Sequence, residues 1–154
     1  MSEFGGSGIT EELFDWIVKT IPLGKTMIEL GAGYVSTKFL SGKYKLYSVE
    51  NNAKYLNVYP STYIYAPIDT ATGWYYRKAL EEELPKEYDC LLVDGPAGEG
   101  SRWGFLHNLD LFRSDVPIVV DDTWRGAEKE MLLKIAEKTN RKYELFQNFG
   151  VIYI

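Results

Sequence analysis

The sequence has a single cysteine, a single histidine, no long apolar run and no block of basic residues. Because Cys90 has no partner for an internal disulfide, we expect a reducing, cytoplasmic setting. No stretch approaches the roughly 20 apolar residues that a membrane-spanning helix needs, so we expect no membrane partner. The net charge is −5, and without a clustered basic patch no nucleic-acid partner is expected either.

What the sequence does contain is typical of a globular domain. The chain has 154 residues, of which 45% are hydrophobic and 25% charged, which suits one domain with a real core. Residues 1–8 (MSEFGGSG) are predicted to be a flexible leader or a cloning remnant, and residues 9–154 a single domain. The domain has no insertion that could cover a substrate, and a second copy of the chain could do so instead. A homodimer is therefore one of the alternatives.

Short apolar runs alternate with amphipathic segments along most of the chain. Runs buried on both faces indicate a parallel sheet between two helical layers, and the last two runs, which have no helix between them, indicate a hairpin. We therefore predict an α/β fold: a doubly wound, Rossmann-like, mostly parallel seven-stranded sheet with a C-terminal antiparallel hairpin. Strands are expected at 25–30, 45–50, 61–68, 88–95, 116–122, 143–147 and 151–154. Helices are expected at 9–21, 51–59, 73–84, 105–112 and 124–139, and a turn that runs into a helix is expected at 31–42.

Acidic residues stand at or just beyond the carboxyl ends of the first five predicted strands. In open parallel sheets, ligands bind beyond these ends, so acids gathered there indicate a site rather than a solvated surface. The acids are Glu29, Glu50, Asp69, Asp94, Asp121 and Asp122.

The first strand runs into a glycine-rich loop at 31–33, which lets the backbone approach a ligand closely. Glu50 follows Gly31 by 19 residues, near the spacing at which an acid accepts hydrogen bonds from ribose hydroxyls. Dinucleotide-binding folds share this layout, but they usually have a third Gly or Ala where Ser36 stands. They also have no use for Glu29, which would repel a pyrophosphate. We interpret the loop as a site for a nucleoside that carries positive charge.

The combination of E-x-G-x-G after the first strand, an acid after the second and Asp-Gly after the fourth resembles the class I S-adenosylmethionine-dependent methyltransferases, over residues 10–154. The resemblance implies S-adenosylmethionine as the cofactor, with the methionine part near the glycine-rich loop, the ribose on Glu50, and the adenine near Asn51 or Asp69. The cofactor-binding residues implied are Glu29, Gly31, Ala32, Gly33, Glu50, Asn51, Asp69 and Asp94.

Three of the strand-end acids, Asp94, Asp121 and Asp122, follow neighbouring strands and are expected to converge. Hard oxygen ligands of this kind suit Mg²⁺ or another divalent cation. In this the chain resembles the metal-dependent small-molecule O-methyltransferases, which implies a cation that orients an acceptor hydroxyl and lowers its pKa. That family's basic lysine is replaced here by Ala97, which leaves Asp94, His107 or the cation alone to activate the acceptor.

The expected acceptor is an oxygen of a small polyhydroxylated molecule, sugar-like or catechol-like. Several segments resemble a group of small methyltransferases of which some are linked to polysaccharide assembly. Four aromatic residues expected near the rim would suit stacking on a sugar face: Trp74, Tyr75, Trp103 and Trp124. Nitrogen-directed families commonly carry an Asn- or Asp-Pro-Pro-aromatic motif after the fourth strand, whereas this chain has Asp-Gly-Pro-Ala at 94–97.

Other interpretations stay open at this point. The three acids could be strand-end caps that bind no metal, with Asp122 capping the following helix. His107 could be structural. The whole chain could be a cofactor-binding module without turnover, or an NAD(P)-dependent reductase.

Overall fold

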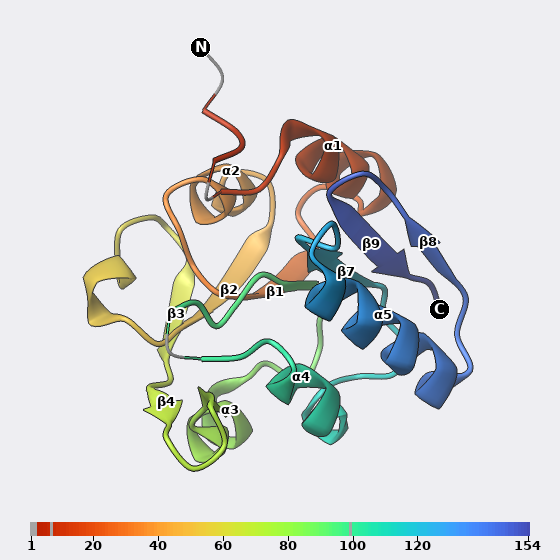
Figure 1. Ribbon diagram of the computed structural model, residues 1–154. Helices are drawn as coiled ribbons and strands as arrows, with labels where there is room; N and C mark the ends of the chain where they lie inside the picture. Colours follow the sequence, from red (N-terminus) through yellow and green to blue (C-terminus); the bar gives the residue numbers. More distant parts are fainter. Residues whose placement is uncertain (1–2, 7, 99) are drawn as a thin grey trace.

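The computed structural model describes residues 3–6, 8–98 and 100–154. Its central feature is a seven-stranded sheet of order β3-β2-β1-β6-β7-β9-β8, seen nearly edge-on in Figure 1. The strands are β1 (Thr26–Leu30), β2 (Lys45–Glu50), β3 (Thr62–Tyr65), β6 (Cys90–Val93), β7 (Ile118–Asp121), β8 (Tyr143–Leu145) and β9 (Phe149–Ile152).

Helices cover both faces of this sheet. In Figure 1, α1 and α2 lie on one face, and α3, α4 and α5 lie on the other. The α-helices are α1 (Glu11–Thr20), α2 (Ser36–Ser41), α3 (Arg77–Glu83), α4 (Gly104–His107) and α5 (Gly126–Thr139), and short 3₁₀ turns occupy Ala53–Tyr55 and Leu109–Leu111.

The strand pairing confirms the predicted fold class. Strands β3, β2, β1, β6 and β7 are mutually parallel, whereas β9 runs antiparallel to both β7 and β8. The chain winds outward from β1 to β3, then returns to the other side of β1 with β6. Ligands in open α/β sheets bind at such a switch point, beyond the carboxyl ends of the strands.

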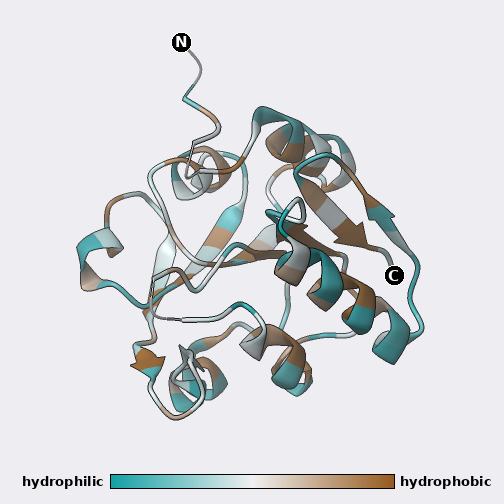
Figure 2. Cartoon of the chain, in the orientation of Figure 1, coloured by the Kyte–Doolittle hydropathy of each residue, from teal (hydrophilic) through white to brown (hydrophobic). Residues whose placement is uncertain are grey.

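Alternate residues of the central strands pack into two separate cores, which explains why β6 is apolar throughout and why Glu29 is the one acid inside β1. Ile28 and Leu91 point into the core under α3, α4 and α5. Met27 and Leu92, their neighbours in sequence, point into the core under α1. In Figure 2, β7 is accordingly mostly brown, and α5 carries a brown stripe beside a teal outer face.

The segment 73–84 differs from its prediction. Trp74–Tyr75 form a short strand, β5, paired antiparallel with β4 (Ile68–Asp69), and α3 begins only at Arg77. Both aromatic side chains are 1% exposed. The expectation that Trp74 and Tyr75 would stack on a sugar at the rim is therefore wrong, because burying two large rings in the core stabilises the fold more than exposing them would.

The predicted leader lies partly outside the described residues, which exclude residues 1–2 and 7. Of the residues that are described, Phe4 stacks on Phe39 with ring centroids 4.5 Å apart. Glu3 forms an exposed ion pair with Lys38 at 3.0 Å. Among the described residues, no helix has the length and apolar character required to cross a membrane.

Candidate cofactor pocket and acidic rim

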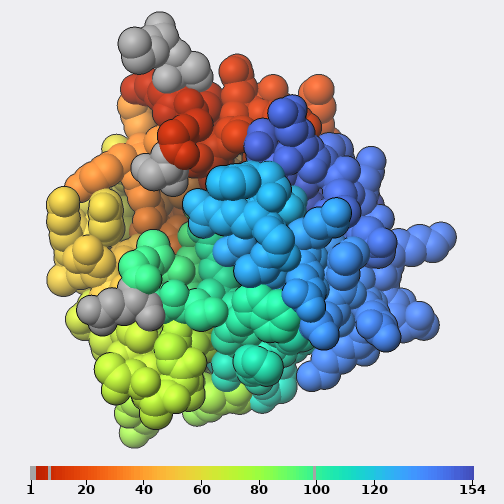
Figure 3. Space-filling view, in the orientation of Figure 1, coloured from red at the N-terminus to blue at the C-terminus, as the bar shows by residue number. Residues whose placement is uncertain are grey.

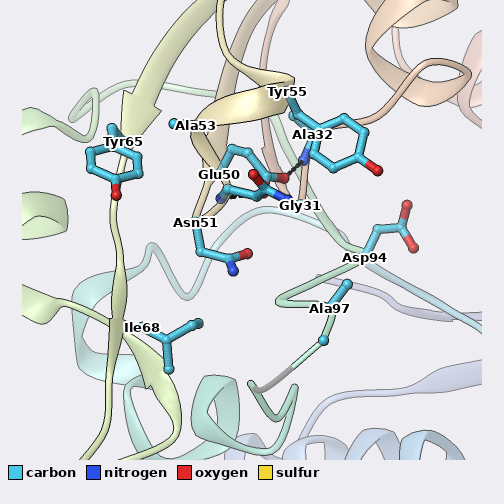
Figure 4. Close-up of a pocket in the computed structure, with 12 residues that line it drawn as sticks. Gly31, Ala32, Glu50, Asn51, Ala53, Tyr55, Tyr65, Ile68, Asp94 and Ala97 are labelled. Atoms are coloured by element: carbon cyan, nitrogen blue, oxygen red, sulfur yellow. Dashed lines mark hydrogen bonds between the residues drawn. The ribbon is translucent and has the colours of Figure 1, made fainter.

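A cavity of about 640 Å³ opens beyond the carboxyl ends of β1, β2 and β6. Figure 4 shows Asn51 and Tyr65 on one side of it and Asp94 and Ala97 on the other. In Figure 3 the segments near residue 55 (yellow) and near residue 98 (green) lie close together on the same face of the molecule. The lining residues are Gly31, Ala32, Glu50, Asn51, Asn52, Ala53, Tyr55, Tyr65, Ile68, Asp94, Ala97 and Gly98.

Glu50 is held rigidly at the end of β2. Its Oε1 accepts a hydrogen bond from the Ala32 amide at 3.0 Å, and its Oε2 accepts one from the Asn52 amide at 2.7 Å (Figure 4). Burial raises the pKa of Glu50, and these backbone hydrogen bonds oppose the rise. Each carboxylate oxygen has a second lone pair. The side chain can therefore still accept hydrogen bonds from a ligand's hydroxyl groups in the cavity.

Gly31 makes the close approach of β1 and β6 possible. Its φ of +96° lies in the region that favours glycine. A Cβ atom at this position would lie 2.6 Å from the Asp94 carbonyl oxygen and 2.9 Å from the Gly95 nitrogen. Two backbones thus touch at the floor of the cavity, where only glycine fits.

Glu29 does not face the cavity, which corrects the expectation that it contacts the cofactor. Its side chain is completely buried. Oε1 accepts a hydrogen bond from the Ser36 hydroxyl at 2.7 Å, and Oε2 accepts from Thr37 at 2.6 Å and from Ser48 at 2.5 Å. The Gly33 amide in turn donates to the Thr37 hydroxyl at 3.0 Å. Glu29 therefore holds the glycine-rich loop from beneath.

The structure separates the remaining cofactor candidates. Asn51 lines the cavity, but Asp69 and Gly33 are not among its lining residues. Asp69 lies in the small β4–β5 hairpin, where its carboxylate accepts a hydrogen bond from the Ala71 amide at 2.9 Å. An acid that caps its own turn in this way has a local role.

Sequence reasoning missed three lining residues with large side chains. Tyr55 and Tyr65 stand on opposite sides of the cavity in Figure 4, and Ile68 lies below them. Tyr65 is 47% exposed. Tyr65 could have been found from the sequence, because side chains alternate along a strand and every second residue of β3 points away from the core.

The three acids predicted as metal ligands do converge. Asp94, Asp121 and Asp122 each offer a carboxylate oxygen, and these atoms all lie within 4.8 Å of one another. Asp94 follows β6, Asp121 ends β7, and these two strands are paired in parallel. Asp122 adopts a left-handed backbone conformation, with φ +62°. We call these three residues the acidic rim, and Asp94 also lines the cavity.

Arg102 lies against the acidic rim. Its guanidinium is 3.3 Å from Asp94 Oδ1 and 2.9 Å from Asp122 Oδ2. It also donates to the backbone carbonyl oxygen of Asp121 at 3.2 Å. The Arg102 side chain is 10% exposed, so these contacts are largely shielded from solvent. One arginine therefore joins the ends of two neighbouring strands.

Burial and crowding change the acidity of the rim. Burial and the neighbouring Asp121 carboxylate raise the pKa of Asp94 well above its ordinary range, and Arg102 opposes that rise. Burial, with a contribution from Asp122, raises the pKa of Asp121 to about 6. A carboxyl group with a pKa of about 6, as at Asp121, can take up or release a proton near neutral pH.

The acidic rim fits a divalent cation by its donor set. Carboxylate oxygens are the ligands that Mg²⁺ prefers, and three carboxylates supply more oxygens than Arg102 engages. Arg102 contacts one oxygen of Asp94 and one of Asp122. Asp122 Oδ1 also accepts a hydrogen bond from Trp124 Nε1 at 3.3 Å, and Asp94 and Asp121 share a side-chain hydrogen bond, so a cation would have to replace these contacts as well as those of Arg102.

His107 does not reach the site. It lies at the end of α4 with an exposed side chain. It lines a different hollow, together with Leu106 and three residues of α5: Lys134, Glu137 and Lys138. The structure therefore gives no support to His107 as the base and leaves Asp94 as the candidate at the cavity.

Known structures share this fold at low sequence identity. MycE methyltransferase from the mycinamycin biosynthetic pathway, in complex with Mg, SAH and mycinamycin VI, superposes with a TM-score of 0.61 at 12% identity over 92% of this chain and 45% of that one. A TehB-like SAM-dependent methyltransferase from Corynebacterium glutamicum gives a TM-score of 0.57 at 15% identity, over 99% and 88% of the two chains. The E. cuniculi Mtq2–Trm112 complex, responsible for methylation of the eRF1 translation termination factor, gives 0.53 at 15% identity, over 92% and 89%.

These similarities establish the fold. The chain has the Rossmann-like α/β fold of class I S-adenosylmethionine-dependent methyltransferases, as the sequence motifs predicted. It spans about half the length of the MycE chains. No protein-family model and no curated protein sequence matches it.

Proposed function

We propose that the protein is an S-adenosylmethionine-dependent methyltransferase that acts on a hydroxyl oxygen of a small polyhydroxylated molecule, assisted by a divalent cation. The observation that carries this proposal is the position of Asp94. It lines the cavity together with the fixed Glu50 carboxylate, and it also belongs to the acidic rim. A cofactor in the cavity and an acceptor at the rim would therefore be neighbours.

The cofactor would be held by Glu50 at its ribose and by the Gly31–Ala32 backbone at its methionine part. When bound, it supplies a methyl group made electrophilic by the sulfonium. Ile68 and Asn51 would pack beside the adenine, since both line the part of the cavity nearest β2 and β4. The acidic character of the site suits a cationic ligand and disfavours a pyrophosphate.

The acceptor would bind at the acidic rim. A divalent cation there, when bound, would lower the pKa of a coordinated hydroxyl and fix its direction. The chain's own contribution is to keep Asp94, Asp121 and Asp122 within 4.8 Å of one another, at the edge of the cavity. Such fixed placement of reactants supplies much of the rate enhancement in group transfer.

Transfer to a hydroxyl forms a C–O bond, breaks the S–CH₃ bond with its electron pair returning to sulfur, and releases one proton. That proton needs an acceptor at the site, because Ala97 stands where the related enzymes have a lysine. Asp94 lies at both the cavity and the acidic rim, and its ionised carboxylate can accept that proton. Asp94 is therefore the residue we assign as general base.

The Mg in the MycE complex supports cation assistance on this fold. We do not infer the acceptor of this chain from that of MycE, because this chain covers only 45% of the MycE chain. The Mtq2–Trm112 complex, responsible for methylation of a translation termination factor, has the same fold, so the fold alone does not select the acceptor.

Calorimetry with S-adenosylmethionine, S-adenosylhomocysteine and NAD tests the cofactor. We expect the first two ligands to bind and NAD not to bind. Binding of NAD without either nucleoside would overturn the proposal in favour of a reductase. Methyl transfer from radiolabelled S-adenosylmethionine to catechol and to methyl glucoside, with Mg²⁺ or with a chelator, tests the acceptor class and the cation. Turnover that persists unchanged in chelator would remove the cation from the proposal.

A further inference from the structure

Arg102 is the structural feature of the acidic rim that the proposed chemistry does not use. Its guanidinium contacts Asp94, Asp122 and the Asp121 carbonyl at 3.3, 2.9 and 3.2 Å respectively. The rest of the loop that carries it, from Pro96 to Trp103, makes no ion pair to the rim within the described residues. Arg102 is thus a single positive charge built into a cluster of three carboxyl groups.

A second arginine provides a comparison at the same rim. Arg125 lies 3.9 Å from Asp122 and its side chain is 49% exposed. Its guanidinium also lies over the Trp124 ring, 5.1 Å from the centroid. An exposed ion pair at this distance is strongly screened by water and contributes little. Arg102 is therefore the one of these two arginines that interacts strongly with the rim.

The position of Arg102 puts it in competition with a cation. The ligand oxygens of the rim all lie within 4.8 Å of one another, and the guanidinium contacts two of the three carboxylates. A divalent ion among the same oxygens would lie within a few ångströms of a positive charge from which little water separates it. We expect repulsion at such short range to outweigh the benefit that the arginine gives by orienting the carboxylates and by favouring the ionised form of Asp94.

We propose that Arg102 is a positioning residue that sets the cation affinity of the acidic rim: its guanidinium holds Asp94 and Asp122 together when no cation is bound, and it weakens cation binding by occupying the same carboxylates. The inference rests on the proposed function, because it takes the rim to be a cation site. It goes beyond that function in two respects. The cation binds the acidic rim weakly and exchangeably, and Arg102 is the side chain responsible.

Two substitutions separate the charge of Arg102 from its geometry. Arg102→Met keeps a long side chain and removes the charge. Arg102→Lys keeps the charge on a compact ammonium, which cannot bridge two carboxylates as a planar guanidinium does. Arg125→Met is the matched control, because it removes a positive charge from the same rim without removing the bridge.

The measurement is Mn²⁺ binding to the full chain in the absence of cofactor and acceptor, followed by electron paramagnetic resonance of free Mn²⁺ and by calorimetry. We expect Arg102→Met to bind Mn²⁺ at least about ten-fold more tightly than the wild type, and Arg102→Lys at least about three-fold more tightly. Arg125→Met is expected to stay within about two-fold.

Thermal unfolding supplies a second readout. Without Mn²⁺, Arg102→Met should have a lower Tm than the wild type, because three crowded carboxylates lose their partner. Added Mn²⁺ should raise the Tm of this variant by more than it raises that of the wild type. If Arg102→Met does not fold, Arg102→Lys carries the same two tests.

The outcomes separate this inference from the proposed function. If the wild type binds Mn²⁺ and the Arg102 variants bind it equally or more weakly, the proposed competition between Arg102 and the cation is wrong, and the cation site itself is supported. If neither the wild type nor any variant binds Mn²⁺ at millimolar concentration, the cation part of the proposed function is wrong, and the inference fails with it. Calorimetry with S-adenosylmethionine remains informative in both cases.

Discussion

Two groups of acids stand at the same edge of the sheet, and they are stabilised in opposite ways. Glu29 in β1 accepts hydrogen bonds from hydroxyl groups, and Glu50 at the end of β2 accepts them from backbone amides. Neither forms a salt bridge within the described residues. Beyond β6 and β7, the acidic rim is held by the charge of Arg102.

The difference shows which half of the site is fixed and which can exchange partners. Hydrogen bonds from neighbouring backbone are formed when the strands and the loop fold, so the Glu50 side of the cavity is preorganised. A carboxylate cluster neutralised by one side chain can accept another cation in its place. We therefore expect substitutions in the first group to alter folding and cofactor binding, and substitutions in the second to alter chemistry.

The largest expected effect is on chemistry. Asp94→Asn should lower turnover about 10³-fold, equivalent to about 4 kcal/mol, because it removes the proton acceptor and one cation ligand. Cofactor affinity should stay within a few-fold, since Glu50 and the loop amides are unchanged. Steady-state rates and calorimetry on the same preparation check both. Unchanged turnover would place the base elsewhere, and a parallel loss of cofactor affinity would erase the distinction between the two halves.

The next effect is on folding of the fixed half. Gly31→Ala should lower the free energy of unfolding by about 3 kcal/mol, because its φ of +96° and the backbone contact at 2.6 Å both exclude a side chain. Gly33→Ala is the matched control in the same loop, where the nearest atom to a new Cβ lies 4.0 Å away. Urea unfolding of both variants is the measurement. Equal losses would mean that the contact with β6 is not the cause.

The fold could be predicted from the sequence because its signals are local and repeated. Apolar strands alternate with helices, and α1 begins at a clear cap, because Thr10 accepts a hydrogen bond from the Leu13 amide. The short β4–β5 hairpin was missed because Trp74–Tyr75 directly precede a true helix, and the sequence pattern places them in its first turn. Only the tertiary core decides that these rings are buried as a strand.

The site could be predicted in part, for a related reason. Strand ends fix where Glu50, Asp94 and Asp121 lie, so their convergence follows from the order of the strands. The direction of a side chain at such an end depends on its neighbours. Glu29 is paired in register with Ser48 on β2, and that hydroxyl turns it into the core. The bridge from Arg102 comes from a loop whose path no periodicity specifies.

The buried Glu29 carboxylate makes stability depend on pH. Burial raises its pKa from 4.5 to about 7 in the folded chain, although hydrogen bonds from Ser48, Thr37 and Ser36 oppose the rise. Because the folded state then binds the proton more tightly than the unfolded state, the contribution of Glu29 to stability is fully present below pH 4.5 and is lost as the pH rises to about 7. The loss amounts to about 3 kcal/mol.

Glu29→Gln should remove that dependence. The free energy of unfolding of the variant, relative to the wild type, should increase by up to about 3 kcal/mol between pH 4.5 and pH 7. Asp94 and Asp121 titrate in both proteins, so their effects cancel in the difference. Denaturant unfolding across this pH range is the measurement, with the exposed Glu83→Gln as the control. A flat difference for Glu29→Gln would show that its carboxyl group is not desolvated as the structure indicates.

The smallest expected effect tests the fixed half of the cavity directly. Glu50→Gln preserves the shape of the side chain but replaces one acceptor oxygen with an amide nitrogen, which faces the amide of either Ala32 or Asn52. The carboxylate loses its charge and part of its fixed orientation, so S-adenosylmethionine should bind about ten-fold more weakly, equivalent to 1.4 kcal/mol. Asp69→Asn is the paired control, because Asp69 caps its own turn outside the cavity and should leave the affinity unchanged. If calorimetry found the larger loss in Asp69→Asn, the cofactor would lie against the β4–β5 hairpin instead of the end of β2.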